Sequence, residues 1–378
     1  MKQPFCDVHT IAFFKSWSSS SKPLDLSLSD YFRAHRSLGA TDRRQVGEAV
    51  YTLVRWKSLF DCLDPSYSTS KRLSLYRQKP IESWTADPHL PEAARAGLSP
   101  FLFEKLISSY GPSQGRQIAL ALNSPAPITV RVNLLKTSRE ELLRKWESTF
   151  AVKASSKTPT ALIFSKREPL FALPEFKEGL FEVQDEGSQH VAACIEAKSG
   201  DRVLDYCSGS GGKSLAIAPN MGGKGELYLH DIRASSLMEA KRRLKRAGIQ
   251  NAQILENEHP TLQKLRGKMD WVLADVPCTG TGTLRRNPDM KWKIDAPMLE
   301  RLIEEQRSIF SKALLYCKPT GKIVYATCSI LPEENQRQVE YFLKSFPVAL
   351  DKEPLQLLPE LAGCDGFFAA VFRKLPKG

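Results

Sequence analysis

The stretch Arg202-Val-Leu-Asp-Tyr-Cys-Ser-Gly-Ser-Gly-Gly-Lys213 joins a short apolar run to a loop rich in glycine, and its context decides the fold class. We expect a strand over 202–206, a loop over 207–213 and a helix after it. The glycines permit positive φ and let a ligand approach the backbone closely, and the N-terminus of the following helix offers free N–H groups. The spacing fits neither a dinucleotide fingerprint, whose last glycine would fall on Ser214, nor a P-loop, which would need glycine in place of Cys207. A plain tight turn is the alternative for such a loop taken alone.

Strands and helices alternate regularly from about residue 185 onward. Short apolar runs predict the strands, and apolar residues at helical spacing predict the helices between them. Such an alternation with short connections is typical of an α/β fold with a doubly wound, Rossmann-like sheet. The expected strands are 202–206, 226–230, 252–255, 270–275, 322–326 and 367–372, and the expected helices are 187–197, 235–247, 299–316 and 333–345.

The first 184 residues show other patterns, which predict two further domains before the main one at 185–378. Residues 1–98 form a helical N-terminal region and linker: 1–65 are helical in pattern, and 66–98 are rich in Ser, Pro and charge, as loops are. Residues 99–184 form a small α+β module that we expect to bind RNA. Its helical pattern over 99–123 is followed by a strand at 128–133, a helix opened by the capping box Ser138-x-x-Glu141, and a strand at 161–164.

Composition favours a polyanionic partner. Lys and Arg number 54 against 42 Asp and Glu, a formal charge of +12, which suits nucleic acid first, although charge kept for solubility is the alternative. Eight cysteines without a C-x-x-C pair, and only six histidines, argue against a zinc site, so no metal is expected. No apolar run approaches about 18 residues and no signal-peptide pattern opens the chain. We therefore expect a cytoplasmic monomer with reduced thiols and no membrane partner.

Two cysteine motifs each lie just past an expected parallel strand, Asp275-Val-Pro-Cys278 and Thr327-Cys328-Ser329. The carboxyl ends of strands in an open α/β sheet share a crevice where ligands bind, so the two thiols could meet at one site. A thiolate can attack carbon while a second thiol handles protons. The alternative is a pair of buried cysteines that act as small hydrophobes.

An acidic residue, Asp231, ends the second expected strand, about 20 residues after the glycine loop. An acid at this place is suited to accept hydrogen bonds from ribose hydroxyls. A helix N-cap is the alternative role, because Ser235 and Ser236 follow closely. We favour ribose because the loop and the acid occur together.

Taken together, these motifs resemble the NOL/NOP/Sun (Sun-type) family of RNA cytosine-C5 methyltransferases, in its bacterial ribosomal-RNA-type members. The resemblance covers about 125–375, and the N-terminal part more loosely resembles a NusB-like domain. It implies a Rossmann-like methyltransferase sheet, S-adenosyl-L-methionine as cofactor and RNA as substrate. Besides the glycine loop and the two cysteine motifs, the matching segments are Val183-Gln-Asp-Glu-Gly-Ser188, Gly280-Thr-Gly-Thr-Leu-Arg-Arg-Asn-Pro-Asp289, Lys291-Trp292, Pro332-Glu-Glu-Asn335 and Asp365-Gly-Phe-Phe368.

The resemblance also implies residue roles. Cys328 would be the nucleophile toward cytosine C6, Cys278 would assist release, and Asp275 would lie near both the methionine moiety and the base. The residues alone leave the two cysteines open, because DNA cytosine methyltransferases attack with a Pro-Cys cysteine. The implied cofactor residues are Cys207, Ser208, Gly209, Ser210, Gly211, Gly212, Lys213, Asp231, Glu258 and Asp275.

Three departures from the family pattern stand out. The loop has Cys-Ser-Gly-Ser where members often have Cys-Ala-Ala-Pro, so we expect it to be more flexible. Ser236 stands where an Arg commonly follows the ribose acid, and Asn257-Glu258 stands where Gly-Asp usually contacts adenine.

A basic segment, Gly280 to Lys293, follows the first cysteine motif. We expect it to bind RNA through Arg285, Arg286, Lys291 and Trp292, because cations suit phosphates and an aromatic ring suits a stacked base. A solvated loop with Trp292 packed inward is the alternative.

Ribosomal RNA is therefore the favoured substrate, and transfer RNA is the nearest alternative. A non-catalytic RNA-binding or ribosome-assembly factor is the competing hypothesis, since the departures at Ser236 and Glu258 could weaken cofactor binding.

Overall fold

The computed structural model describes residues 4–17, 22–257, 259–361 and 363–376, and the chain divides into two compact units. One unit comprises Met1–Pro125 and Thr283–Met298. The other comprises Ala126–Gly282 and Leu299–Gly378, and it contains the glycine loop and both cysteine motifs.

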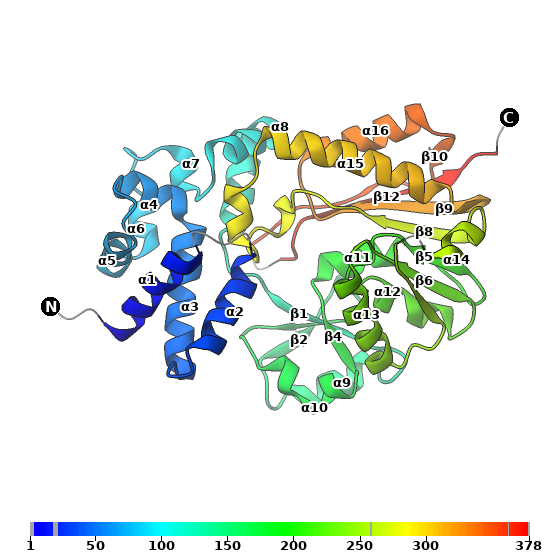
Figure 1. The fold of residues 1–378 in the computed structure, drawn as a ribbon, viewed down its shortest axis with the longest axis horizontal. Coiled ribbons are helices and arrows are strands. Elements are labelled where there is room, and N and C mark those ends of the chain that lie inside the picture. The colour runs from blue at the N-terminus through cyan, green and yellow to red at the C-terminus, as the bar shows by residue number, and fades with distance from the viewer. Residues whose placement is uncertain (1–3, 18–21, 258, 362, 377–378) are drawn as a thin grey trace. The chain divides into compact units, whose positions relative to one another are not determined.

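An eight-stranded mixed sheet organises the second unit (Figure 1). Five strands run parallel: β5 (Arg202–Asp205), β6 (Glu226–His230), β7 (Ala252–Leu255), β8 (Met269–Asp275) and β9 (Cys317–Thr327). The order β9-β8-β5-β6-β7 makes the chain wind outward from β5 in both directions, which confirms the doubly wound sheet. β12 (Phe367–Lys374) pairs antiparallel with β9, and β10 (Val348–Leu350) and β11 (Leu355–Leu357) pair with β12.

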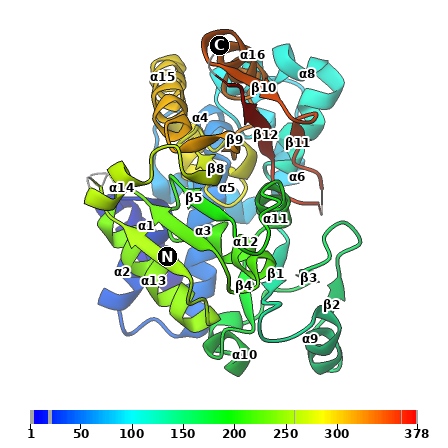
Figure 2. The ribbon, with the colours of Figure 1, turned by 90° about the vertical axis from the view of Figure 1, so that its right-hand side faces the viewer.

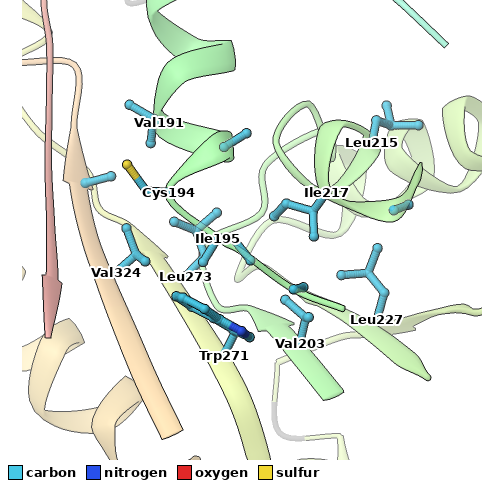
Figure 3. Close-up of a cluster of buried hydrophobic side chains, with 14 of the residues drawn as sticks. Val191, Cys194, Ile195, Val203, Leu215, Ile217, Leu227, Trp271, Leu273 and Val324 are labelled. Carbon is cyan, nitrogen blue, oxygen red and sulfur yellow. The ribbon is translucent and has the colours of Figure 1, made fainter. Parts of the chain in front are cut away.

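Helices cover both faces of this sheet. α11 (Glu186–Ala193), α12 (Ser214–Ile217) and α13 (Ala234–Ala247) pack over one apolar cluster, part of which is drawn in Figure 3. α14 (Pro260–Lys264), α15 (Ala296–Leu314) and α16 (Gln336–Ser345) pack over a second cluster on the other face. The central strands are buried on both faces, which explains why each is a continuous apolar run rather than an alternating one.

The expected elements of this unit are present, with shifted ends. Helix α13 stops where expected because Gly248 adopts φ 80°, a left-handed conformation that glycine takes without a Cβ clash. The expected helix 187–197 ends early, at Ala193. The helix after the glycine loop is only four residues long, so its N-terminus contributes little dipole.

A small antiparallel sheet precedes the main one, in the order β2-β3-β1-β4 (Figure 2). Its strands are β1 (Ile128–Val132), β2 (Val152–Ala154), β3 (Ala161–Phe164) and β4 (Phe181–Val183), and the helices α9 (Arg139–Trp146) and α10 (Pro174–Lys177) pack with it. Trp146 is buried against Phe164 and Phe181. The Ser138 hydroxyl accepts the Glu141 N–H at 3.1 Å, so the serine half of the expected capping box forms, while the Glu141 carboxylate accepts from the Thr137 hydroxyl.

The first unit is helical in its described part. It contains α1 (Phe5–Trp17), α2 (Leu24–Ala34), α3 (Ala40–Arg55), α4 (Lys57–Leu63) and α8 (Pro100–Ala121), the last kinked at Gly111-Pro112. α8 groups with this unit, whereas the sequence prediction placed 99–123 with the module that follows. No helix in the described ranges is long and apolar enough to cross a membrane.

The prediction of a linker or loop over 66–98 was wrong. This stretch holds α5 (Thr69–Gln78), α6 (Ile81–Thr85) and α7 (Glu92–Arg95). Pro80 and Pro91 stand immediately before α6 and α7, where a missing N–H breaks no intrahelical bond. The Ser and Pro residues therefore delimit short helices here instead of excluding them.

Candidate active site

Three neighbouring strand ends define one edge of the main sheet. Asp205 ends β5, Asp275 ends β8 and Thr327 ends β9, and the pairing registers place Asp205 beside Leu273 and Asp275 beside Ala326. The chain reverses its winding direction between β5 and β8, which is the point where open α/β sheets bind ligands. Residues that follow these strands therefore converge.

The two thiols predicted to meet do so. The sulfur of Cys278, in the loop after β8, lies 3.4 Å from the sulfur of Cys328, directly after β9. Both are free and half-buried, with no disulfide between them. The two motifs, far apart along the chain, thus meet at one place.

The surroundings of the two sulfurs shift their pKa values in opposite directions. A hydrogen bond from the Cys278 thiol lowers the pKa of Cys328 against the opposing effect of burial, and the Lys213 ammonium helps to lower it. The same hydrogen bond, together with burial, raises the pKa of Cys278 well above its ordinary value. The pair therefore favours a thiolate at position 328 and a protonated thiol at position 278.

Lys213 leaves the glycine loop toward this centre. Its Nζ lies 2.5 Å from Oδ2 of Asp275. Burial lowers the pKa of Lys213, but the Asp275 carboxylate, with Cys328 and Asp205, raises it, and the net shift is upward. Lys213 is thus a charged, largely buried member of the site.

Glu334 is a site residue that the sequence prediction missed. Its Oε1 accepts the Thr279 N–H and the Gln306 amide, both at 2.9 Å, and its Oε2 accepts the Thr279 hydroxyl at 2.5 Å. Burial raises its pKa. The acid lies in the Pro332-Glu-Glu-Asn335 match and ties this segment to the residue after Cys278. The Pro332-Glu-Glu-Asn335 motif was visible in the sequence, but only the contacts show that Glu334 holds the loop that contains Cys278.

The glycine loop lies beside the end of β6. The Ser208 N–H donates to the His230 carbonyl at 2.9 Å, and the Gly209 N–H donates to Asp231 at 2.8 Å. Gly211 has φ 78°, and a Cβ there would lie 3.1 Å from Leu229 and 3.2 Å from Ala240. Glycine is required at 211 by both conformation and space.

Asp231 remains ionised although it is largely buried. Burial raises its pKa, but the hydrogen bonds from Arg233 and from Gly209 together outweigh burial, so the net shift of the pKa is downward. The Arg233 guanidinium donates through Nε at 3.1 Å, and thereby places a cation on the acid although Ser236 is not an arginine. Next to it, Ile232 is 73% exposed, an apolar side chain that the sequence prediction did not single out.

Comparisons with known proteins agree with this geometry. The family model described as 16S rRNA methyltransferase RsmB/F matches residues 192–373, and a model of the ferredoxin-like domain of RsmF/B-like methyltransferases matches residues 99–170. The ribosomal RNA small subunit methyltransferase B of Vibrio cholerae is 33% identical over 306 residues, which are 79% of this chain and 70% of that protein. The chain belongs to the RsmB/F methyltransferase family.

Other relatives support the same assignment. The ribosomal RNA small subunit methyltransferase B of Photorhabdus laumondii is 34% identical over 288 residues, which are 72% of this chain and 66% of that protein, so the chain spans about two thirds of that relative. The solved structure of a methyltransferase homolog protein from Pyrococcus horikoshii is 26% identical and covers 75% of this chain and 97% of its own, with a TM-score of 0.67. The Sun-type resemblance and the Rossmann-like methyltransferase fold are thereby confirmed.

S-adenosylmethionine is the cofactor of the RsmB/F family, and the loop residues of this chain fit it. A Cβ on Gly209 or Gly212 would meet nothing closer than 3.8 Å or 3.6 Å, so the loop is open there to a ligand. Within the described residues, the buried Ser208 hydroxyl has no hydrogen-bond partner, as expected of a group that bonds a bound molecule. The Asp231 carboxylate already accepts from the Gly209 N–H and from the backbone N–H, Nε and Nη2 of Arg233, so a ribose hydroxyl would have to replace one of the Arg233 bonds.

Two further predicted cofactor residues stand apart from this group. Burial strongly raises the pKa of the Cys207 thiol, which suits packing rather than chemistry. Glu258, the predicted adenine contact, lies outside the described residues.

The four residues of the basic segment that we expected to bind RNA lie in the first unit, and two of them, Arg285 and Lys291, are buried. Lys291 is fully buried, and its ammonium donates to the Gly97 carbonyl and the Asn123 amide oxygen. Burial lowers its pKa well below the ordinary value. Its stem and charge are held inside this unit, where they cannot meet phosphates.

The other residues of that segment follow the same trend. The Trp292 indole donates to the Val54 carbonyl at 2.7 Å and packs against the core of the helices. Arg285 is 2% exposed, and Arg286 is half-buried. Trp292 is therefore packed inward, as the alternative had it, but the segment is not a solvated loop, because Arg285 and Lys291 are buried in the helical unit.

Proposed function

We propose that this chain is an S-adenosylmethionine-dependent RNA cytosine-C5 methyltransferase that acts on small-subunit ribosomal RNA. The observation that carries the proposal is the 3.4 Å separation of the Cys278 and Cys328 sulfurs beside the Lys213–Asp275 pair. The substrate class follows from the relatives, which are named as ribosomal RNA small subunit methyltransferases.

The chemistry needs a nucleophile because C5 of cytosine is too weak to attack a methyl group unaided. The Cys328 thiolate adds to C6, which moves an electron pair onto C5 and makes it nucleophilic. When bound, S-adenosylmethionine would supply an electrophilic methyl group to C5 and would be left as S-adenosylhomocysteine. A base then takes the C5 proton, the C5–C6 double bond re-forms, and Cys328 leaves as a thiolate.

The assigned roles agree with the charges around the sulfurs. Cys328 has its pKa lowered by the hydrogen bond from Cys278 and by Lys213, which suits a nucleophile at neutral pH. Cys278 keeps its proton, since its pKa is raised, and with its sulfur 3.4 Å from that of Cys328 it is our candidate to assist release of the adduct. Asp275 offers a carboxylate that can accept from the exocyclic amine or protonated N3 of the base.

The target cytosine has to be unpaired, because a thiol can reach C6 face-on only when the base has left its stack. Single-stranded or bulged RNA is therefore the expected form of the substrate. We further expect a monomer located in the cytoplasm. Sedimentation would test the oligomeric state, and cell fractionation would test the location.

The decisive experiment incubates the full chain with labelled S-adenosylmethionine and separate pools of unmodified ribosomal and transfer RNA. We expect 5-methylcytosine in small-subunit ribosomal RNA, located by bisulfite sequencing. Label in transfer RNA alone would move the activity to the alternative substrate. Absence of 5-methylcytosine from every pool would overturn the proposal.

A non-catalytic RNA-binding or ribosome-assembly factor is the second candidate, favoured by the departure at Ser236. Arg233 already places a guanidinium on Asp231, which weakens that reason. The candidates differ in cofactor binding, and calorimetric titration with S-adenosylhomocysteine separates them. Micromolar binding supports the enzyme, whereas RNA binding without cofactor binding supports the factor.

A further inference from the structure

Side chains from outside the glycine loop hold its backbone carbonyls. Arg243, on α13, donates through Nη1 to the carbonyl of Ser210 at 2.9 Å and to its hydroxyl at 2.8 Å. Arg131, on β1 of the small sheet, donates through its own Nη1 to the Gly212 carbonyl at 3.0 Å. Two arginines distant in sequence thus bind alternate carbonyls of one loop.

Gln184 completes this group. Its Nε2 donates to the Gly212 carbonyl at 3.1 Å, while its Oε1 accepts from Arg131. The Gly212 carbonyl therefore receives two donors at once. We call Arg131, Gln184 and Arg243 the carbonyl clamp.

Glu182 anchors the clamp to the small sheet. It lies on β4 directly across from Arg131 of β1 in the antiparallel register. Its Oε2 accepts from Nε and Nη2 of Arg243 at 3.2 Å and 3.1 Å, and its Oε1 accepts from Arg246. Strand β1 thus carries Arg131, and strand β4 holds Arg243 through Glu182.

The buried Arg131 is costly for the fold, which indicates a role beyond packing. It is 5% exposed, and burial lowers its pKa to about 10 although Glu182 acts in the opposite direction. The two oxygens to which it donates are neutral. A buried cation bonded to neutral acceptors is a poor source of stability compared with an apolar side chain.

We infer that the carbonyl clamp positions the 207–213 loop for the cofactor. The loop has glycine at 209, 211 and 212, and such a backbone loses much conformational freedom when it is ordered by a ligand. With the Ser210 and Gly212 carbonyls held by the clamp, part of that ordering precedes binding. The clamp residues are positioning residues, and the loop is less mobile than its composition alone predicts. The inference rests on the proposed function only in taking this loop as the S-adenosylmethionine site.

Arg246 supplies a matched control. It shares Glu182 with Arg243, but its guanidinium lies 4.0 Å from the centre of the Phe176 ring on α10, and within the described residues its side chain donates no hydrogen bond to the loop. Removing either arginine therefore breaks an ion pair to Glu182, and only Arg243 removes a loop contact. A purely structural role would affect both variants alike.

The test compares full-length wild type, Arg243→Gln, Arg246→Gln and Arg243→Lys, with no RNA present. Calorimetry measures the Kd for S-adenosylhomocysteine, and hydrogen exchange without ligand measures the mobility of residues 207–213. We expect Arg243→Gln to raise Kd about tenfold, as for loss of a hydrogen bond from a charged donor, and to speed exchange in the loop. We expect Arg246→Gln to stay within about twofold of wild type, and Arg243→Lys to recover part of the affinity.

A kinetic readout follows where methylation is measurable: KM for S-adenosylmethionine should rise in Arg243→Gln while kcat changes little. Equal Kd and equal exchange in Arg243→Gln and Arg246→Gln would overturn the clamp. If Arg243→Gln does not fold, as judged by circular dichroism, Gln184→Ala repeats the test. A wild type that binds no cofactor would count against the proposed function, while the exchange data on the free protein would still decide the clamp.

Discussion

The two halves of the active edge are stabilised in different ways. The cysteine half is held mainly by its own motif segments: Thr279 follows Cys278 and bonds Glu334, and Thr281 bonds Ser329, which follows Cys328, at 2.9 Å. The cofactor half is held from outside, by Arg131 on the small sheet and Arg243 on α13. A self-contained half is visible in its motifs, whereas the other half depends on residues that no loop pattern includes.

The sharpest test of the cysteine half replaces each of its two cysteines in turn. Cys328→Ala should lower methyl transfer by about 10³-fold or more and form no RNA adduct, because the nucleophile is gone. Cys278→Ser should form the adduct but release it slowly, so protein cross-linked to RNA accumulates. Denaturing gels with labelled RNA measure both. Cross-linked RNA in the Cys328→Ala protein instead would reverse the assigned roles.

The link between the two halves is the Lys213–Asp275 pair. Lys213→Met should reduce kcat about 10²-fold or more, because a buried cation no longer favours the Cys328 thiolate. The pH profile of single-turnover methylation should then shift upward, since loss of the cation raises the pKa of Cys328. An exposed lysine, Lys241, mutated to Met serves as the control. An unchanged profile in Lys213→Met would show that the two halves act independently.

Glu334 joins the segment after β9 to the loop that contains Cys278 within the cysteine half. Glu334→Gln places an amide against donors that now meet a carboxylate, and we expect a loss of about tenfold in kcat with little change in KM for the cofactor. Glu340→Gln is the matched control, because Glu340 is an exposed acid on α16. A rise in the cofactor KM instead would mean that Glu334 supports the other half.

An effect on stability rather than on activity is expected of Asp205, at the end of β5 between the halves. Burial raises its pKa from 3.8 to about 7, so the folded chain holds a proton that the unfolded chain has released. The free energy of unfolding should therefore fall as pH rises from 3.8 to about 7, and this contribution should be constant above that pH. Asp205→Asn removes the dependence, and a thermal melt at pH 5 and pH 8 should show a smaller difference in Tm than wild type shows. An equal difference in both proteins would contradict the shift.

Much of the fold could be predicted because its information is local. Strand β7 was predicted at its observed bounds, Ala252–Leu255, from an apolar run, and α13 stopped at Gly248 because glycine alone takes that conformation easily. The region 66–98 was misjudged because Pro80 and Pro91 are as common before a helix as within a loop.

The site divides along the same line. The sequence by itself determined the doubly wound sheet, the pairing of two cysteine motifs at one edge and the glycine loop, because strand order and backbone freedom follow from short-range patterns. Only the tertiary structure decided which charges face solvent and which are buried: Lys291 lies inside the helical unit, and Arg131 reaches the Gly212 carbonyl across 81 positions of sequence. A lysine or arginine looks the same in the sequence whether it is buried or exposed, because its desolvation is set by the segments that pack around it.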